Sequence, residues 1–450
     1  METLILSWYV LVETGSVLVL TVFASLLYIG TLLAPMFGVI ADRIGRRNLL
    51  CAMRAVYAIL AAALMAFIFT GVLTPVYVLV IAAPVGIVRP SDMGMRAALV
   101  GDTMPTDRLM GAMSIQSTTQ HSARIAGALS GAGLVAMLGM GVAYVVVVSL
   151  YAASFLLTLK AGGTGAVLRP PDNMAPARPR DTLAEHPARE AGATARFPQS
   201  AGFAGNVSAR PRDASEERLL VAAGVTARFP QSAGFAGNVS ARPSPWRDLG
   251  AGLTYVWNTP HLLAVMWLAF LVNLTAFPLV MGLLPYVAKE MYRTDQTGLG
   301  YLVASFAFGS LVGSIALSRI GSAVRPARMM IVCCAIWYAL IIVFAQMPSP
   351  AGGIPALMLA GLAHSLGMVP MSVLILRYTE ERFRGRVMGL RMMAIYGVPM
   401  GLLVAGPLIA RFGYPATATA YCATGLVFIL LIAVHWRAHL WRLDARANLR

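Results

Sequence analysis

Long apolar runs recur along this 450-residue chain, and they limit its fold more than any other feature. About 20 apolar residues in a helix cross a hydrocarbon core of about 30 Å. The chain cannot cross lipid with unpaired backbone groups, so such runs must be helical. The runs are 16–40, 49–69, 76–97, 109–138, 142–159, 262–287, 298–317, 329–347, 355–376, 387–410 and 415–436. A shorter run, 4–12, covers about half a span. The sequence therefore predicts an all-α polytopic membrane protein with 11 full spans and a first helix that is cut short.

Composition agrees with this class and excludes several others. With 58% hydrophobic and 12% charged residues, the chain is too apolar for a soluble domain. Its net charge of +16 comes largely from arginines between the apolar runs, a pattern typical of membrane topology rather than of nucleic-acid binding. The sequence contains no phosphate-binding Gly-Lys-Ser or Gly-Lys-Thr loop, no catalytic cluster and no metal-type cysteine spacing. We therefore expect no enzyme activity, no cofactor, no metal and no direct use of ATP.

A short charged loop separates the second and third expected spans. Its glycines and charges follow the spacing G-x-x-x-D-R-x-G-R-R, formed by Gly38, Asp42, Arg43, Gly45, Arg46 and Arg47. This pattern resembles the signature loop of the major facilitator superfamily. The resemblance implies two pseudo-symmetric halves of six helices that rock about a central site. It also implies that the loop is a conformational latch, in which Asp42 docks against the start of the eleventh span.

The two halves show traces of internal duplication. Segment 41–45 aligns with 317–321, keeping Arg, Ile and Gly while Ser318 replaces the aspartate. An ungapped shift of 274 residues also matches one arginine and three glycines: Arg108, Gly111, Gly127 and Gly139 with Arg382, Gly385, Gly401 and Gly413. We expect halves at 1–160 and 248–436. Segment 247–257 resembles the region before the seventh helix in the enterobactin-exporter and macrolide-efflux-like branch.

Residues 161–247 differ from the rest in being rich in Ala, Gly, Pro, Arg and Ser, which predicts a disordered linker. Within it, 191–211 and 223–243 are near-identical copies, which indicates a tolerated insertion, a sequence artefact or a duplicated docking motif. Arginines accumulate in alternate loops, so we expect both termini, the linker and the tail 437–450 in the cytoplasm of a bacterial-type inner membrane.

Charged and polar residues inside the spans are candidates for function, because each is costly in lipid. The fourth span carries Arg89, Asp92 and Arg96 on one face, and the fifth carries His121 and Arg124. Asn273 and His364 add polar groups to the seventh and tenth. Asp92 could couple transport to protons or form an ion pair with its arginines. For His121, Arg124 and His364 the alternatives are a pocket or interhelical packing.

The sequence thus predicts a secondary transporter that exports a small amphipathic compound, such as a drug or siderophore. We expect a small-molecule substrate, a proton as coupling ion, lipid as surroundings and no nucleic-acid partner. The alternative is a truncated, non-transporting membrane protein or a partner-binding scaffold built around the linker.

Overall fold

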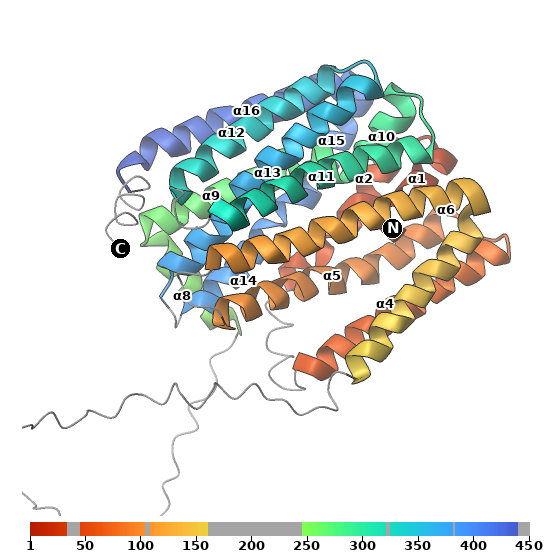
Figure 1. Ribbon diagram of the computed structural model, residues 1–450, viewed down its shortest axis with the longest axis horizontal. Helices are drawn as coiled ribbons and strands as arrows, with labels where there is room; N and C mark the ends of the chain where they lie inside the picture. The colour runs from red at the N-terminus through yellow and green to blue at the C-terminus, as the bar shows by residue number, and fades with distance from the viewer. Residues whose placement is uncertain (34–45, 104–108, 161–244, 321–324, 381–382, 440–450) are drawn as a thin grey trace, which may run out of the picture. The chain divides into compact units, whose positions relative to one another are not determined.

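The computed structural model describes residues 1–33, 46–103, 109–160, 245–320, 325–380 and 383–439, and in these residues the regular elements are helices (Figure 1). The first set of helices lies before residue 161. It comprises α1 (Glu2–Thr14), α2 (Val17–Leu26), the 3-10 turn η1 (Ile29–Leu33), α4 (Arg46–Phe69), α5 (Pro75–Thr103) and α6 (Leu109–Lys160).

The second set of helices begins at Pro245 and ends with the last long helix of the chain. It comprises α8 (Pro245–Trp257), α9 (Pro260–Thr275), the π-helical turn η3 (Pro278–Gly282), α10 (Leu284–Tyr286), the π-helical turn η4 (Val287–Met291), α11 (Gln296–Ile320), α12 (Pro326–Gln346), α13 (Pro350–Tyr378), α14 (Arg384–Ala394), α15 (Gly397–Phe412) and α16 (Tyr414–His435).

Eight helices in the described residues are long and apolar enough to cross a membrane. One of them, α6, has 52 residues and contains Gly139 in a non-helical conformation (φ 81°, ψ 170°). It therefore comprises both expected runs, 109–138 before Gly139 and 142–159 after it. Two shorter apolar helices, Val17–Thr31 and Pro75–Arg89, lie where the second and fourth spans are expected. The all-α polytopic fold class is confirmed.

Several expected boundaries were wrong, and prolines explain the clearest case. In the expected span 262–287 the α-helix ends at Thr275, because Pro278 and Pro285 lack the N–H that an α-helix needs. Mainly π-helical turns continue the segment. The span 387–410 is divided between α14 and α15 at Ile395–Tyr396. Helix α8 begins at Pro245.

The two sets of helices pack against each other through two main pairs. Helix α2 packs on α15, and α6 packs on α11; α6 also contacts α13. Within the second set, α13 lies between α11 and α12. Figure 1 shows α8 and α14 at one end of the helices and α10 at the other.

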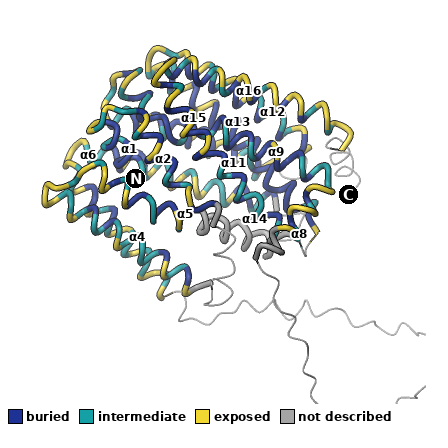
Figure 2. The backbone as a smooth tube through the Cα atoms, turned by 180° about the vertical axis from the view of Figure 1, so that it is seen from behind, coloured by how far each residue is buried: buried dark blue, intermediate teal, exposed yellow. Residues whose placement is uncertain are grey.

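Burial separates inner from outer helices. In the best 18-residue window of each, 78% of α13 is buried, against 17% of α6. Figure 2 shows the buried residues gathered on α13, α11 and α9, with exposed residues along α4, α6 and α16. Large apolar side chains are exposed on these helices, among them Ile59, Met137 and Leu430, as expected for helices that contact lipid.

Glycines allow the inner helices to approach closely. Gly309 on α11 lies against the backbone of Met358, and Gly361 on α13 lies against the backbone of Phe306. Lipid is as apolar as the side chains, so helices in a membrane associate by packing rather than by hydrophobic burial. Small residues at the contact are therefore what joins α11 to α13.

Candidate functional site

His364, in the middle of α13, lies within a cluster of aromatic rings from α6, α11 and α12, together with Phe277, which directly precedes η3. The distances between its ring centroid and those of its neighbours are 4.8 Å to Trp337, 5.3 Å to Phe306, 5.4 Å to Phe277 and 6.1 Å to His121. Its Nδ1 lies 3.4 Å from Ser310 Oγ, which donates to the carbonyl of Gly361 at 2.9 Å. His364 is only 8% exposed, so its ring sits in a packed aromatic setting.

Arg124 and His121 are the residues through which the first set of helices contributes to this cluster. They are three residues apart on α6 and so lie on one face. The Arg124 guanidinium donates from Nη2 to the thioether sulfur of Met281 on η3, at 2.7 Å. A thioether is a weak acceptor. No acidic side chain of the described part of the chain forms an ion pair with Arg124, so its charge is met there chiefly by weak or aromatic groups.

Asn273 is close in sequence to Phe277 but makes a different contact. Its Nδ2 donates to the carbonyl of Ala269 at 2.7 Å, one turn earlier on α9. The amide is thus hydrogen-bonded within its own helix.

Arg89 belongs to a second polar site, within the first set of helices. A cavity of about 270 Å³ lies between α1, α2, α4, α5 and α6. Its polar lining is Glu2, Thr3, Arg54, Tyr57, Arg89 and Tyr151. Tyr151 donates to Glu2 Oε2 at 2.6 Å, and Arg89 donates to Thr3 Oγ1 at 3.2 Å. Arg89 thus contacts Thr3 and lines this cavity.

The remaining sequence candidates are only partly described. Asp92 and Arg96 lie on the backbone of α5, but their side chains fall outside the described residues. Gly38, Asp42, Arg43 and Gly45 of the expected latch also lie outside them. Arg46 and Arg47 form the first turn of α4.

Sequence reasoning missed Glu2 as well as the aromatic residues around His364. Glu2 could have been noticed as a lone acid at the head of an apolar run, which is costly in a membrane. The aromatic residues gave no usable signal, because apolar side chains occur in every span and only the fold selects those that meet.

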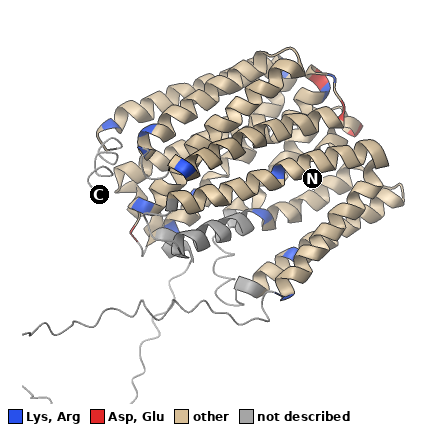
Figure 3. Ribbon diagram, viewed as in Figure 1, with Lys and Arg blue, Asp and Glu red and all other residues tan. Residues whose placement is uncertain are grey.

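Charge is distributed unevenly along the helices. Figure 3 shows Lys and Arg mostly at the end where α8 and α14 lie, and acidic residues mostly at the opposite end. The few cations along the helices thus stand out, and Arg124 lies where the two sets of helices meet. No group of three or more His, Cys, Asp or Glu side chains that could hold a metal occurs among the described residues.

The central groups combine one guanidinium, two imidazoles and several aromatic rings. A guanidinium attracts an anionic group, while aromatic faces and edges pack against a flat apolar body. Imidazoles can donate or accept a hydrogen bond according to their tautomer. None of these groups is a nucleophile paired with a base, so the arrangement favours binding over chemistry.

Comparison with known proteins identifies the family. The sequence model of the Major Facilitator Superfamily matches residues 3–293 and 266–444. No curated protein sequence matches the chain.

Solved structures share the fold at low identity. The chain resembles the human organic anion transporter MFSD10 (TETRAN), with 18% identity over 92% of this chain and 83% of that one, at a TM-score of 0.55. It resembles a bacterial homologue of the iron transporter ferroportin in an outward-facing state, with 14% identity over 100% and 96% and a TM-score of 0.56. It also resembles the fucose:proton symporter FucP of E. coli, with 15% identity over 96% and 93% and a TM-score of 0.52. Because both matched segments together span nearly the whole sequence, the chain belongs to the major facilitator superfamily, whose members are membrane transporters and not enzymes.

Proposed function

We propose that this secondary transporter exports a small amphipathic compound, such as a drug or siderophore, by alternating access. The observation that carries the proposal is the meeting of Arg124 and His121 with His364 and its aromatic neighbours, where α6 packs against the second set of helices. A site shared by both halves becomes accessible from one side or the other as the halves rock.

The chemistry of the site supports a substrate with an anionic group and a flat apolar part. Arg124 supplies a permanent cation inside the bundle, and Trp337, Phe277 and Phe306 supply ring surface. An uncharged sugar has no negative group to pair with the Arg124 guanidinium. The likeness of segment 247–257 to the enterobactin-exporter and macrolide-efflux-like branch supports export as the direction.

The domain organisation and orientation belong to the same proposal. Residues 1–160 and 248–436 would be the two rocking halves, joined by the linker 161–247. The excess of arginine in alternate loops supports a bacterial-type inner membrane with both termini, the linker and the tail 437–450 in the cytoplasm.

A proton gradient is the proposed driving force, and Glu2 is its proposed carrier. The carboxylate faces the cavity, with Tyr151 donating to it and Arg89 lining the same wall. Acidic groups inside a membrane are costly and are found where protons or ions move. Asp92, whose side chain is not described, remains a second candidate.

Glu2→Gln should abolish concentrative export while leaving exchange intact. Gln can still accept the hydrogen bond from Tyr151, so the fold persists, but it cannot release a proton. Export from preloaded vesicles under an imposed pH gradient should fall to the rate of leakage from equally loaded vesicles that contain no protein. Glu13→Gln, on the exposed end of the same helix, is the matched control and should export normally. Gradient-driven export by Glu2→Gln would show that another group carries the proton.

The basic loop is proposed as the latch of the cytoplasmic face. Helix α14 begins at Arg384, and it contacts η1, the turn that leads into the loop, as well as α5. A carboxylate at Asp42 would be attracted to the partial positive charge at the start of that helix.

Asp42→Asn should shift the protein toward its inward-open state. Loss of a charge–dipole contact of roughly 1–2 kcal/mol changes a population ratio by about five- to thirtyfold. Thiol labelling of single cysteines from the cytoplasmic side measures the shift, with Ser318→Asn in the degenerate second loop as control. An Asn variant that labels at the wild-type rate contradicts the latch.

A transport assay tests the proposal as a whole. Cells expressing the chain are loaded with a panel of amphipathic anions, cations and neutral compounds, and efflux is followed with and without a proton uncoupler. We expect uncoupler-sensitive efflux that favours anions. If no compound moves in cells or in reconstituted vesicles, the scaffold alternative is favoured.

A further inference from the structure

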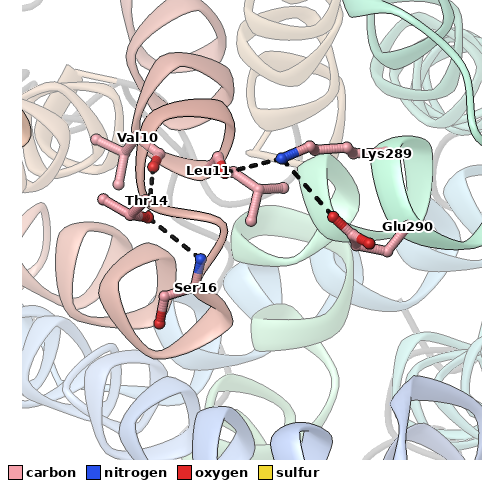
Figure 4. Close-up of polar contacts among 6 residues, drawn as sticks. All are labelled: Val10, Leu11, Thr14, Ser16, Lys289 and Glu290. Atoms are coloured by element: carbon pink, nitrogen blue, oxygen red, sulfur yellow. Dashed lines mark hydrogen bonds and ion pairs between the residues drawn. The ribbon is translucent and has the colours of Figure 1, made fainter.

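Lys289 joins the two sets of helices at the end where α1 finishes. Its Nζ donates to the backbone carbonyl of Leu11 at 3.1 Å, although the two residues are 278 positions apart (Figure 4). Leu11 is fully buried, and Lys289 is 28% exposed. The contact therefore ties the first set of helices to the second from a partly buried position.

The end of α1 is built to receive a cation. The last carbonyls of a helix lack partners within the helix and carry partial negative charge. Gly15, in the left-handed conformation (φ 61°), turns the chain so that its N–H also donates to Leu11, at 3.0 Å. Thr14 Oγ1 donates to the carbonyl of Val10 and accepts from the N–H of Ser16. This closes the turn and leaves the carbonyl of Leu11 facing Lys289.

Backbone hydrogen bonds also order the segment that carries Lys289. Lys289 lies on the π-helical turn η4, which ends with Tyr292 N–H donating to Val287 at 2.9 Å. Arg293 takes a left-handed conformation (φ 51°), rare for a residue with a side chain. The N–H and hydroxyl of Thr294 then both donate to the carbonyl of Ala288, at 2.9 and 3.1 Å.

Nearby charge does not compete strongly for the ammonium group. Glu290, its chain neighbour, lies 3.7 Å from Nζ and is 45% exposed. An exposed pair of this kind contributes little. The contact with the buried carbonyl is thus the one that depends on how the two sets of helices are placed.

We propose that Lys289 is the closing group of this face of the transporter, capping α1 when the two halves are shut at this end. Helix α1 also contacts α10 and α11 here, so opening this face must separate Lys289 from Leu11. Helices α8 and α14 lie at the opposite end of the helices. The inference rests on the proposed alternating access and assigns its second gate.

Thiol labelling tests the gate without needing a substrate. Cys51, Cys333, Cys334 and Cys422 are replaced by Ala, and Thr21→Cys is the reporter. Thr21 is 1% exposed, lies close to the start of α2, and its hydroxyl faces Gly406 of α15. A membrane-impermeant maleimide is applied to each side of sealed vesicles. Lys289→Met should raise the rate of labelling from one side by about tenfold. This is the change in the open population expected when one hydrogen bond to a charged group is lost.

Matched variants separate the gate from charge and from folding. Lys289→Arg keeps a cationic donor and should label near the wild-type rate. Arg411→Met removes a cation whose guanidinium lies over Phe412 of its own helix, and it should also change nothing. Lys289→Gln, a milder change, serves if the Met variant folds poorly, and it should give an intermediate rate.

The outcomes distinguish the gate from the proposed function. Unchanged labelling in folded Lys289→Met or Lys289→Gln overturns the gate, and so does an equal rise in Arg411→Met. Faster labelling in a chain that moves no compound keeps the gate and rejects the proposed transport.

Discussion

Gly361→Val is expected to prevent the stable assembly of the second set of helices. A side chain at this position of α13 would overlap the carbonyl oxygen of Phe306, and it would lie 2.9 Å from that residue's carbonyl carbon and 3.1 Å from the nitrogen of Ser310. All three atoms are backbone, so no flexible side chain can move away. Overpacking a well-packed site costs about 1–3 kcal/mol even when side chains give way. We therefore expect a larger cost here, because α11 itself must shift.

The measurement is thermal unfolding in detergent together with the yield in the membrane fraction. Gly133→Val is the matched control, because it makes the same change in α6 at a place with no atom within 4 Å of the new Cβ. Both variants make the same Gly-to-Val change in helix propensity, so the difference between them reports packing alone. Equal melting temperatures would mean that α11 and α13 can separate at no cost.

Arg124→Gln is expected to reduce export by at least tenfold while the protein stays folded. The guanidinium lies against the sulfur of Met281, and no acidic side chain of the described residues pairs with it. Removing a charge that lacks a strong partner should preserve the free energy of unfolding or raise it. Transport should fall by at least tenfold, about the effect of one charge-assisted contact with an anionic substrate.

Two variants show whether charge or position matters. Arg124→Lys keeps the charge without the planar fork and should retain part of the activity. Arg377→Gln removes a cation from the end of the same bundle, where the guanidinium lies 6.0 Å from the ring of Tyr378, and should export normally. Export of anions by Arg124→Gln at the wild-type rate would place the binding site elsewhere.

Hydropathy determined the class of this protein because it is a local property. Each run of apolar residues forces a helix wherever lipid surrounds it, whatever its neighbours are. The sequence also determined the family, since the spacing of glycines and charges in 38–47 can be read without a partner segment. Hydropathy did not predict the ends of the α-helices near Pro278 and Pro285, because the backbone there forms π-helical turns that leave no periodic pattern in the sequence.

Tertiary structure alone decided which polar groups meet. His121 and His364 were both candidates, but their contact depends on how α6 packs against the second set of helices. Arg89, another candidate, donates to Thr3 Oγ1 and lines a cavity among the first set of helices. The hydrogen bonds from Tyr151 to Glu2 and from Lys289 to Leu11 join residues 149 and 278 positions apart. Such pairs leave no periodic trace in one sequence, because the direction of a side chain is set by its helix while its partner is set by the packing of all the others.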